Sequence, residues 1–227
     1  MQQDTEFAPY LKPSATIDSD NETIRQFVSQ RTQDANTPAE KAAQLYYAVR
    51  DGIRYDPYGI DLSIDGLRAS GTLSAGRGWC VSKAVLLAAA CRAAGIPARL
   101  GFADVRNHLS TERMRAQMQT DVFFWHGYTS IYLSGNWVKA TPAFNIELCD
   151  RFGLKPLAFD GKTDAIYHPF DLQGNRHMEY LSYRGEFQDV PIERIRETFR
   201  KAYTLTSLGS DADFVRDVDR ETAPREN

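Results

Sequence analysis

The sequence lacks any long apolar run, any excess of basic residues and any leader-like start. Its longest apolar stretch, residues 84–91, is far shorter than the roughly 20 residues of a membrane-spanning helix. The formal net charge of −3 is unlike the basic footprint of a nucleic-acid-binding domain. The first residues, Met1–Glu6, are polar and acidic, without the apolar segment of a signal peptide. We therefore expect a cytoplasmic protein that binds neither membranes nor nucleic acid.

Cysteine is scarce as well, and its pattern excludes two common kinds of site. The three cysteines, Cys80, Cys91 and Cys149, are odd in number and show no CxxC spacing. This pattern fits neither a disulfide framework nor a zinc site, and it favours a reducing compartment. The histidines have no metal-like spacing either. We therefore expect no metal and no cofactor.

The helix signals come early in the chain. Ser19 and Glu22 have the spacing of a capping box, which predicts a helix over about 20–32. Thr37 and Glu40 form a second such pair, with proline at the first helical position, and predict a helix over 38–52. Residues 59–75 are predicted to be a loop.

Strands dominate the second half of the chain. Alternating or apolar segments predict strands at 98–105, 122–133, 137–142 and 178–183, and a helix at 191–203. Helices followed by strands predict an α+β fold with helices packed on an antiparallel sheet. We expect an N-terminal arm and helix over 1–36, one domain over 37–207, and a disordered tail over 208–227.

Cys80 is the residue that points most directly to a function. It follows a glycine-punctuated turn, and a strongly helical run over 84–94 comes directly after it; Gly95 and Pro97 then end that helix. The thiol is therefore predicted at a helix N-terminus, where free N–H groups and the helix dipole favour an anion. Such a position lowers the pKa of a cysteine and favours the nucleophilic thiolate.

A base for this nucleophile is available further along the chain. His126 lies in the long predicted strand, 46 residues after Cys80. Covalent acyl chemistry needs a nucleophile, a base within reach and a third group that orients the base. The alternative is that Cys80 is a buried structural residue, which is common for free cysteines. Trp79 and Trp125 flank the two residues and either pack or donate an indole N–H to an oxyanion.

The order of these motifs resembles the transglutaminase-like superfamily. The features that carry the resemblance are Gly78-Trp79-Cys80, the run Gly95-Ile96-Pro97-Ala98-Arg99, His126 at a strand start, and Trp137 in the hairpin partner. They extend over about residues 38–145. The resemblance implies a papain-like fold with a Cys-His-Asp site, in which Cys80 is the nucleophile and His126 the general base.

The third residue departs from the family pattern. The family usually has Trp-x-x-x-Asp-Pro on the second hairpin strand, whereas this chain has Thr141 between Trp137 and Pro142. A threonine hydroxyl can accept a hydrogen bond from the imidazole but supplies no charge. Four other residues stay open as the orienting group: Asn145, Asp104, Asp160 and Asp171. Lys83, one turn after Cys80, is either a cation that favours the thiolate or a solvated lysine.

Together these observations favour a cysteine-dependent acyl-transfer or hydrolytic enzyme. Its catalytic residues are predicted to be Cys80, His126 and Thr141, and its substrate a protein, peptide or small molecule with an amide or other carbonyl group. Two alternatives remain open. One is a catalytically degenerate binding module, and the other is C–C or C–N bond cleavage in a small metabolite. The oligomeric state is left open.

Overall fold

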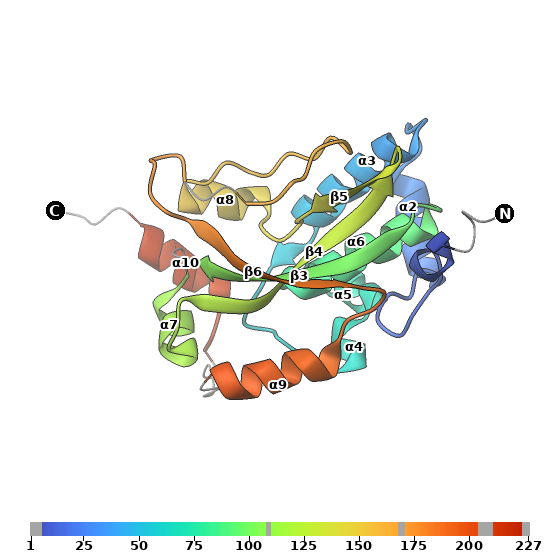
Figure 1. The fold of residues 1–227 in the computed structure, drawn as a ribbon. Helices are drawn as coiled ribbons and strands as arrows, with labels where there is room; N and C mark the ends of the chain where they lie inside the picture. Colours follow the sequence, from blue (N-terminus) through green and yellow to red (C-terminus); the bar gives the residue numbers. More distant parts are fainter. Residues whose placement is uncertain (1–5, 108–109, 168–170, 204–210, 224–227) are drawn as a thin grey trace.

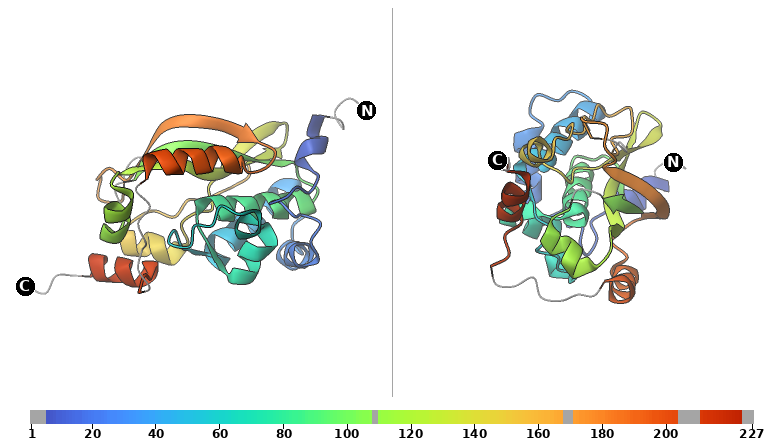
Figure 2. Two further views of the ribbon diagram at one scale, coloured as in Figure 1. Left: turned by 90° about the horizontal axis from the view of Figure 1, so that it is seen from below. Right: turned by 90° about the vertical axis from the view of Figure 1, so that its left-hand side faces the viewer.

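The computed structural model describes residues 6–107, 110–167, 171–203 and 211–223. One four-stranded antiparallel sheet forms a layer, and a group of helices packs against one of its faces (Figure 1, Figure 2). Helix α6 (Cys80–Ala93) lies behind the sheet in Figure 1 and forms the centre of the helical layer. The predicted α+β fold with an antiparallel sheet is confirmed.

The helical layer follows the capping signals closely. Helix α3 (Pro38–Gly52) begins at the predicted capping box, where Thr37 accepts a hydrogen bond from the N–H of Glu40 and the Glu40 carboxylate reaches back. Helix α2 (Glu22–Arg31) begins two residues later than its motif suggested, because Asn21, and not Ser19, caps it. The predicted loop at 59–75 is wrong in part, since it holds the short helices α4 (Ile64–Leu67) and α5 (Ala69–Ala75).

Helix α6 is buried on every side. Every residue from Cys80 to Arg92 is inaccessible to solvent or nearly so. The helix packs against α2, α3 and α5 on one side and against the sheet on the other. Its run of alanines explains how so many elements approach one helix, because a small side chain keeps neighbouring backbones close. A helix that is apolar all round belongs in a core.

The sheet has the strand order β5-β4-β3-β6. Its strands are β3 (Ala98–Asn107), β4 (Val122–Leu133), β5 (Asn136–Ala140) and β6 (Met178–Phe187). A tight turn joins β4 to β5, and both Ser134 and Gly135 adopt positive φ there. Strand β6 pairs with β3 from far along the chain and brings Tyr180 opposite Val105. A separate parallel pair joins β1 (Arg54–Tyr55) to β2 (Arg77–Gly78).

Smaller elements complete the described chain. They are the 3-10 helix η1 (Ala8–Tyr10) and the α-helices α7 (Glu112–Met118), α8 (Ile146–Phe152) and α9 (Ile192–Ala202). Among the described residues, no helix is long and apolar enough to cross a membrane.

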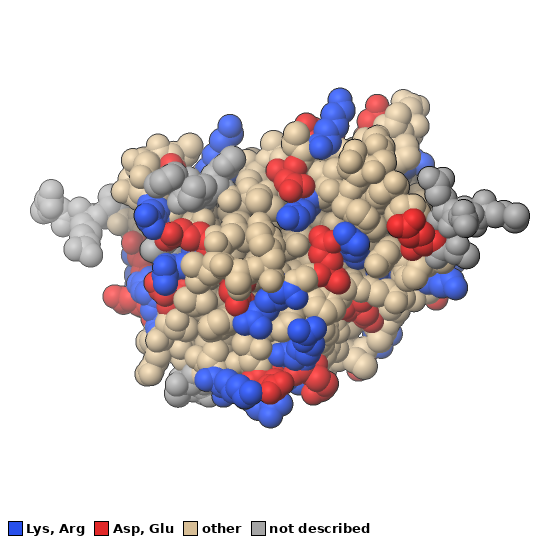
Figure 3. Space-filling model, viewed as in Figure 1, with Lys and Arg blue, Asp and Glu red and all other residues tan. Residues whose placement is uncertain are grey.

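On the face seen in Figure 3, acidic and basic side chains are interspersed without a large region of one sign. The cytoplasmic location stays a prediction.

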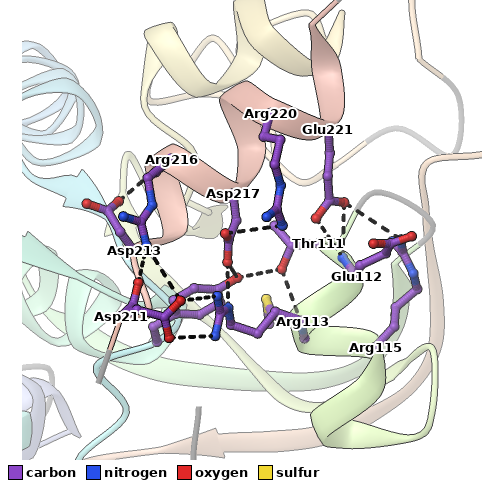
Figure 4. Close-up of polar contacts among 12 residues, drawn as sticks. Thr111, Glu112, Arg113, Arg115, Asp211, Asp213, Arg216, Asp217, Arg220 and Glu221 are labelled. Atoms are coloured by element: carbon purple, nitrogen blue, oxygen red, sulfur yellow. Dashed lines mark hydrogen bonds and ion pairs between the residues drawn. The ribbon is translucent and has the colours of Figure 1, made fainter. Parts of the chain in front are cut away.

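The end of the described chain differs from the expected disordered tail. Helix α10 (Phe214–Thr222) packs on the domain with Phe214 and Val218 buried, and the Asp213 side chain caps its first turn. Residues 204–210 and 224–227 lie outside the described part. Two ion pairs join α7 to α10, Arg113 with Asp217 and Arg115 with Glu221 (Figure 4). The apolar pair Phe214 and Val218, one helical turn apart, is the sequence signal for this helix.

Candidate active site

Cys80 and His126 line the same cavity. The cavity has a volume of about 540 Å³, and its walls are mostly apolar. Six of its lining residues are Tyr55, Tyr58, Met114, Phe123, Phe124 and Phe199. Cys80 is 7% exposed and His126 is 4% exposed, so both side chains lie in the wall of the cavity with little access to solvent. Of the three cysteines, Cys80 is the one that lines this cavity.

The start of α6 places the thiol against strand β4. Trp79 is the N-cap in extended conformation, and the first bond of the helix runs from the N–H of Lys83 to the Trp79 carbonyl. The N–H groups before Lys83 therefore have no acceptor within the helix. Gly127, next to His126, allows the strand to come this close, because a Cβ there would lie 3.0 Å from the Cα of Val81.

The Cys80 thiol and the His126 imidazole are both neutral at pH 7. Burial raises the pKa of the Cys80 thiol to about 11, although the N–H groups of Gly127 and Val81 act against that rise. Burial, assisted by nearby His177, lowers the pKa of His126 to about 4. The predicted lowering of the Cys80 pKa is therefore wrong for the resting site, because desolvation outweighs the effect of the helix N-terminus. Within the described structure, no hydrogen bond joins the Cys80 sulfur to the His126 ring.

A bulge in the sheet sets the position of His126. The pairing of β3 with β4 shifts register between Ala103 and Val105, and Trp125 adopts a left-handed conformation with φ of 61°. Such a conformation is costly for a bulky residue and persists only where the surroundings hold it. Here the Asp104 carboxylate accepts a hydrogen bond from the Trp125 N–H at 3.2 Å. Asp104 thus supports the backbone beside His126.

Thr141 follows β5, and hydrogen bonds hold its backbone on both sides. Its N–H donates to Ala165 at 2.9 Å, and its carbonyl accepts from the Tyr46 hydroxyl at 3.2 Å. The Thr141 hydroxyl is buried and has no partner in the described structure, and the same holds for His126 Nε2 and the Tyr180 hydroxyl. We call these three side chains the His126 cluster.

Strand β6 brings Tyr180 into this cluster. The Tyr180 and His126 rings lie 6.4 Å apart at 77°. Burial raises the pKa of Tyr180, whereas the nearby Thr141 side chain acts to lower it, which places the two hydroxyl groups near one another. Sequence reasoning missed Tyr180, because an aromatic residue in an alternating strand carries no catalytic signature.

One family model matches the part of the chain that holds most of these residues. The model of the transglutaminase-like superfamily matches residues 25–142, just over half of the chain. The chain belongs to the transglutaminase-like superfamily. The matched segment contains Cys80, His126 and Thr141 but ends before β6, so Tyr180 reaches the site from outside the region that defines the family.

Two solved structures are similar to the transglutaminase-like chain over part of their length. One, from Cytophaga hutchinsonii, is described as "a Putative Cysteine Protease"; it is 21% identical with a TM-score of 0.47, covering 61% of this chain and 42% of its own. The other, from Parabacteroides distasonis, is described as "a Putative Protease"; it is 17% identical with a TM-score of 0.38, covering 60% and 25%. The chain thus spans less than half the length of either protein. Among curated proteins, no match was found.

The residues considered as substitutes for the family aspartate are engaged elsewhere. The Asn145 side chain accepts from the N–H of Tyr55 and donates to Glu147. Asp160 and Asp171 accept hydrogen bonds from backbone N–H groups of their own loops. With Asp104 on the Trp125 backbone, none of these four side chains is hydrogen bonded to the imidazole in the described structure.

Lys83 and the two tryptophans also have defined places. Lys83 is neither solvated nor directed at Cys80; its buried ammonium donates to the carbonyls of Arg50 and Ile53 at the end of α3. Burial lowers the pKa of Lys83 to about 7. The Trp125 indole N–H donates to Thr198 at 2.9 Å, which leaves it a packing role. The Trp79 indole N–H is buried without a partner in the described structure.

Proposed function

We propose that this transglutaminase-like chain is a cysteine-dependent hydrolase or acyltransferase that acts on the carbonyl carbon of an amide or ester. The observation that carries the proposal is the shared cavity of Cys80 and His126 at the N-terminus of a buried helix. Nucleophile and base are the two groups that acyl transfer requires first. Membership of the superfamily supports the same assignment.

The pKa values favour a proton transfer that accompanies attack. At pH 7 the Cys80 thiol and the His126 imidazole are both neutral, so no ion pair exists beforehand. As the sulfur forms its bond to the carbonyl carbon, the thiol proton passes to His126. The carbonyl oxygen takes the electron pair and is stabilised by free N–H groups at the start of α6. The amine or alcohol then leaves with the proton from His126, and a thioester remains.

The second half of the reaction releases the acyl group. His126 takes a proton from the incoming nucleophile as that nucleophile attacks the thioester carbonyl, and the Cys80 thiol is restored. Water gives hydrolysis, whereas an amine gives transfer. The apolar walls of the cavity favour a substrate with an aromatic or aliphatic group next to the reacting carbonyl. Thr141 is proposed as the third residue, which orients His126 without adding charge.

A second candidate is a binding module that has lost acyl chemistry. The observation that favours it is the absence of a carboxylate hydrogen bonded to His126 in the described structure. Such a protein would bind small apolar carbonyl compounds in the cavity without forming a covalent bond. Cleavage of a C–C or C–N bond in a small metabolite also remains an alternative use of the same thiol and imidazole.

The test uses p-nitrophenyl phenylacetate, whose aromatic acyl group matches the cavity walls. We expect a burst of nitrophenol equal to the enzyme concentration, and an acyl adduct on Cys80 in the intact and digested mass spectra. Cys80→Ala should abolish both while the protein stays folded, and Cys91→Ala serves as the matched control. A wild-type protein that binds the ester but never carries the adduct would leave the binding module as the better description.

A further inference from the structure

The His126 cluster contains buried polar atoms that form no hydrogen bond in the described structure. They are His126 Nε2, Thr141 Oγ1 and Tyr180 Oη. Buried polar groups in native proteins are nearly always partnered, and exceptions gather where function requires them. Tyr180 lies near both of the others, with its ring 6.4 Å from the imidazole and its hydroxyl near that of Thr141, so the three exceptions indicate a common role.

The imidazole has two different surroundings. Nε2 is fully buried without a hydrogen-bond partner in the described structure, whereas Nδ1, which forms no hydrogen bond there either, is not fully buried. Because His126 lines the cavity, Nδ1 is the nitrogen that faces it. A neutral imidazole carries one proton, and the hydrogen bond made by one nitrogen decides which of the two carries it. An acceptor at Nε2 would keep the proton there and leave the Nδ1 lone pair free for the Cys80 proton.

The cluster offers such an acceptor in two linked hydroxyl groups. Thr141 and Tyr180 lie near one another, and the Tyr180 ring meets the imidazole at 77°. A hydroxyl accepts better when it also donates, since neighbouring hydrogen bonds polarise one another. Tyr167 closes the cluster from another side, with its ring 6.0 Å from the imidazole.

We propose that Tyr180 is a positioning residue that acts through Thr141. In the proposed arrangement, whose hydrogen bonds the described structure does not contain, the Nε2–H of His126 donates to Thr141 Oγ1, and the Thr141 hydroxyl donates to Tyr180 Oη. The two hydroxyls together replace the carboxylate that the family usually places beside its histidine. The proposal rests on the proposed function only for its consequence in catalysis, because the protonation pattern of His126 is a property of the free protein.

The chain provides a matched control on the same strand. Tyr183 stacks on Tyr180, with ring centroids 5.8 Å apart and planes inclined by 14°, but it is half exposed. Tyr183→Phe therefore removes a hydroxyl from a neighbouring ring of the same size. Thr141→Ser keeps the proposed hydroxyl, and Thr141→Val removes it with little change in shape.

The experiment measures the His126 tautomer by ¹⁵N-edited NMR and the rate of Cys80 alkylation by iodoacetamide against pH. We expect the Nε2–H form in the wild type, in Tyr183→Phe and in Thr141→Ser. Tyr180→Phe and Thr141→Val should lose that preference and slow alkylation by about tenfold, the scale of one hydrogen bond. The double variant Thr141→Val/Tyr180→Phe should lose no more than either single variant, because the pair acts as a unit.

Two outcomes would overturn the proposal. One is a wild-type tautomer and alkylation rate in a folded Tyr180→Phe protein. The other is additive loss in the double variant, which would mean that the two hydroxyls act separately. If Tyr180→Phe does not fold, the His126 tautomer and the rate of Cys80 alkylation in Thr141→Val and Thr141→Ser test the proposal instead. Neither measurement involves turnover, so a failure of the proposed acyl chemistry would leave the result for Tyr180 standing.

Discussion

The His126 cluster and the contact between α7 and α10 both bury polar side chains, but they differ in charge and in pairing. In the α7–α10 contact, the buried Asp217 carboxylate accepts from Arg113 at 2.7 Å and from Tyr58 at 2.8 Å, and Arg220 lies 3.4 Å away. Figure 4 shows this network between the two helices. The His126 cluster holds no carboxylate, and its polar atoms make no bond in the described structure.

This difference in pairing assigns different roles to the two regions: the α7–α10 contact contributes to stability, and the His126 cluster to function. A buried group that is fully paired stabilises the contact that it forms, whereas an unpaired one lowers stability and persists for another reason. Tyr58 links the two regions, because it bonds to Asp217 and also lines the cavity of Cys80. The α7–α10 contact thereby supports one wall of the candidate site, while the His126 cluster supports its chemistry.

The largest expected effect is on activity, at His126. His126→Gln should reduce turnover of p-nitrophenyl phenylacetate by about 100- to 10,000-fold, the range for loss of a general base. The free energy of unfolding should not fall, because the histidine contributes a buried nitrogen without a partner. Urea unfolding and initial rates measure the two quantities. Equal losses of stability and activity would show that His126 is a structural residue.

Local signals predicted the positions of Cys80 and His126, but the surroundings of these residues depend on contacts between distant segments. Capping, periodicity and turn residues are local, so they placed the cysteine at the start of a helix and the histidine on a strand. The burial that sets the pKa of Cys80 comes from the whole domain. Tyr180 reaches the cluster only because β6 pairs with β3, where it lies opposite Val105, 75 residues earlier in the chain. No pattern in a single sequence specifies that pairing.

The next effect is on stability, at Asp217. Asp217→Asn should lower the free energy of unfolding by about 1–3 kcal/mol, because Arg113 and Tyr58 lose their charged acceptor. Tyr58→Phe, which removes only one donor, is the milder control. Ester turnover at temperatures well below unfolding should stay within a few-fold of wild type. A large loss of activity in a folded Asp217→Asn protein would contradict the separation of the two regions.

Lowering the pH should reduce the free energy of unfolding in two successive ranges, first through His126 and then through Asp217. The pKa of His126 falls from 6.5 to about 4 on folding, so the unfolded chain binds the extra proton and stability decreases as pH drops from 6.5 to 4. Burial acts to raise the pKa of Asp217, but hydrogen bonds from Arg113 and Tyr58 outweigh it and hold that pKa below 3.8. Its contribution is therefore lost only as pH falls below 3.8. Unfolding curves of His126→Gln should lack the loss in the first range. Those of Asp217→Asn should show a smaller loss in the second, to which other carboxylates with lowered pKa values, such as Asp160 and Asp211, still contribute.

The smallest expected effect comes from giving the His126 cluster the carboxylate that it lacks. Thr141→Asp should raise the pKa of His126 by at least about one unit, since a nearby negative charge favours the imidazolium. Turnover should increase if imidazolium stabilisation limits the rate, as it does for a histidine held by a carboxylate. Thr141→Asn, equal in size but neutral, should leave the pKa near its wild-type value. NMR titration of the His126 ring provides the measurement in all three proteins. A pKa unchanged by Thr141→Asp would place the orienting group of His126 elsewhere, and Tyr180→Phe would then identify whether the phenol alone fills that role.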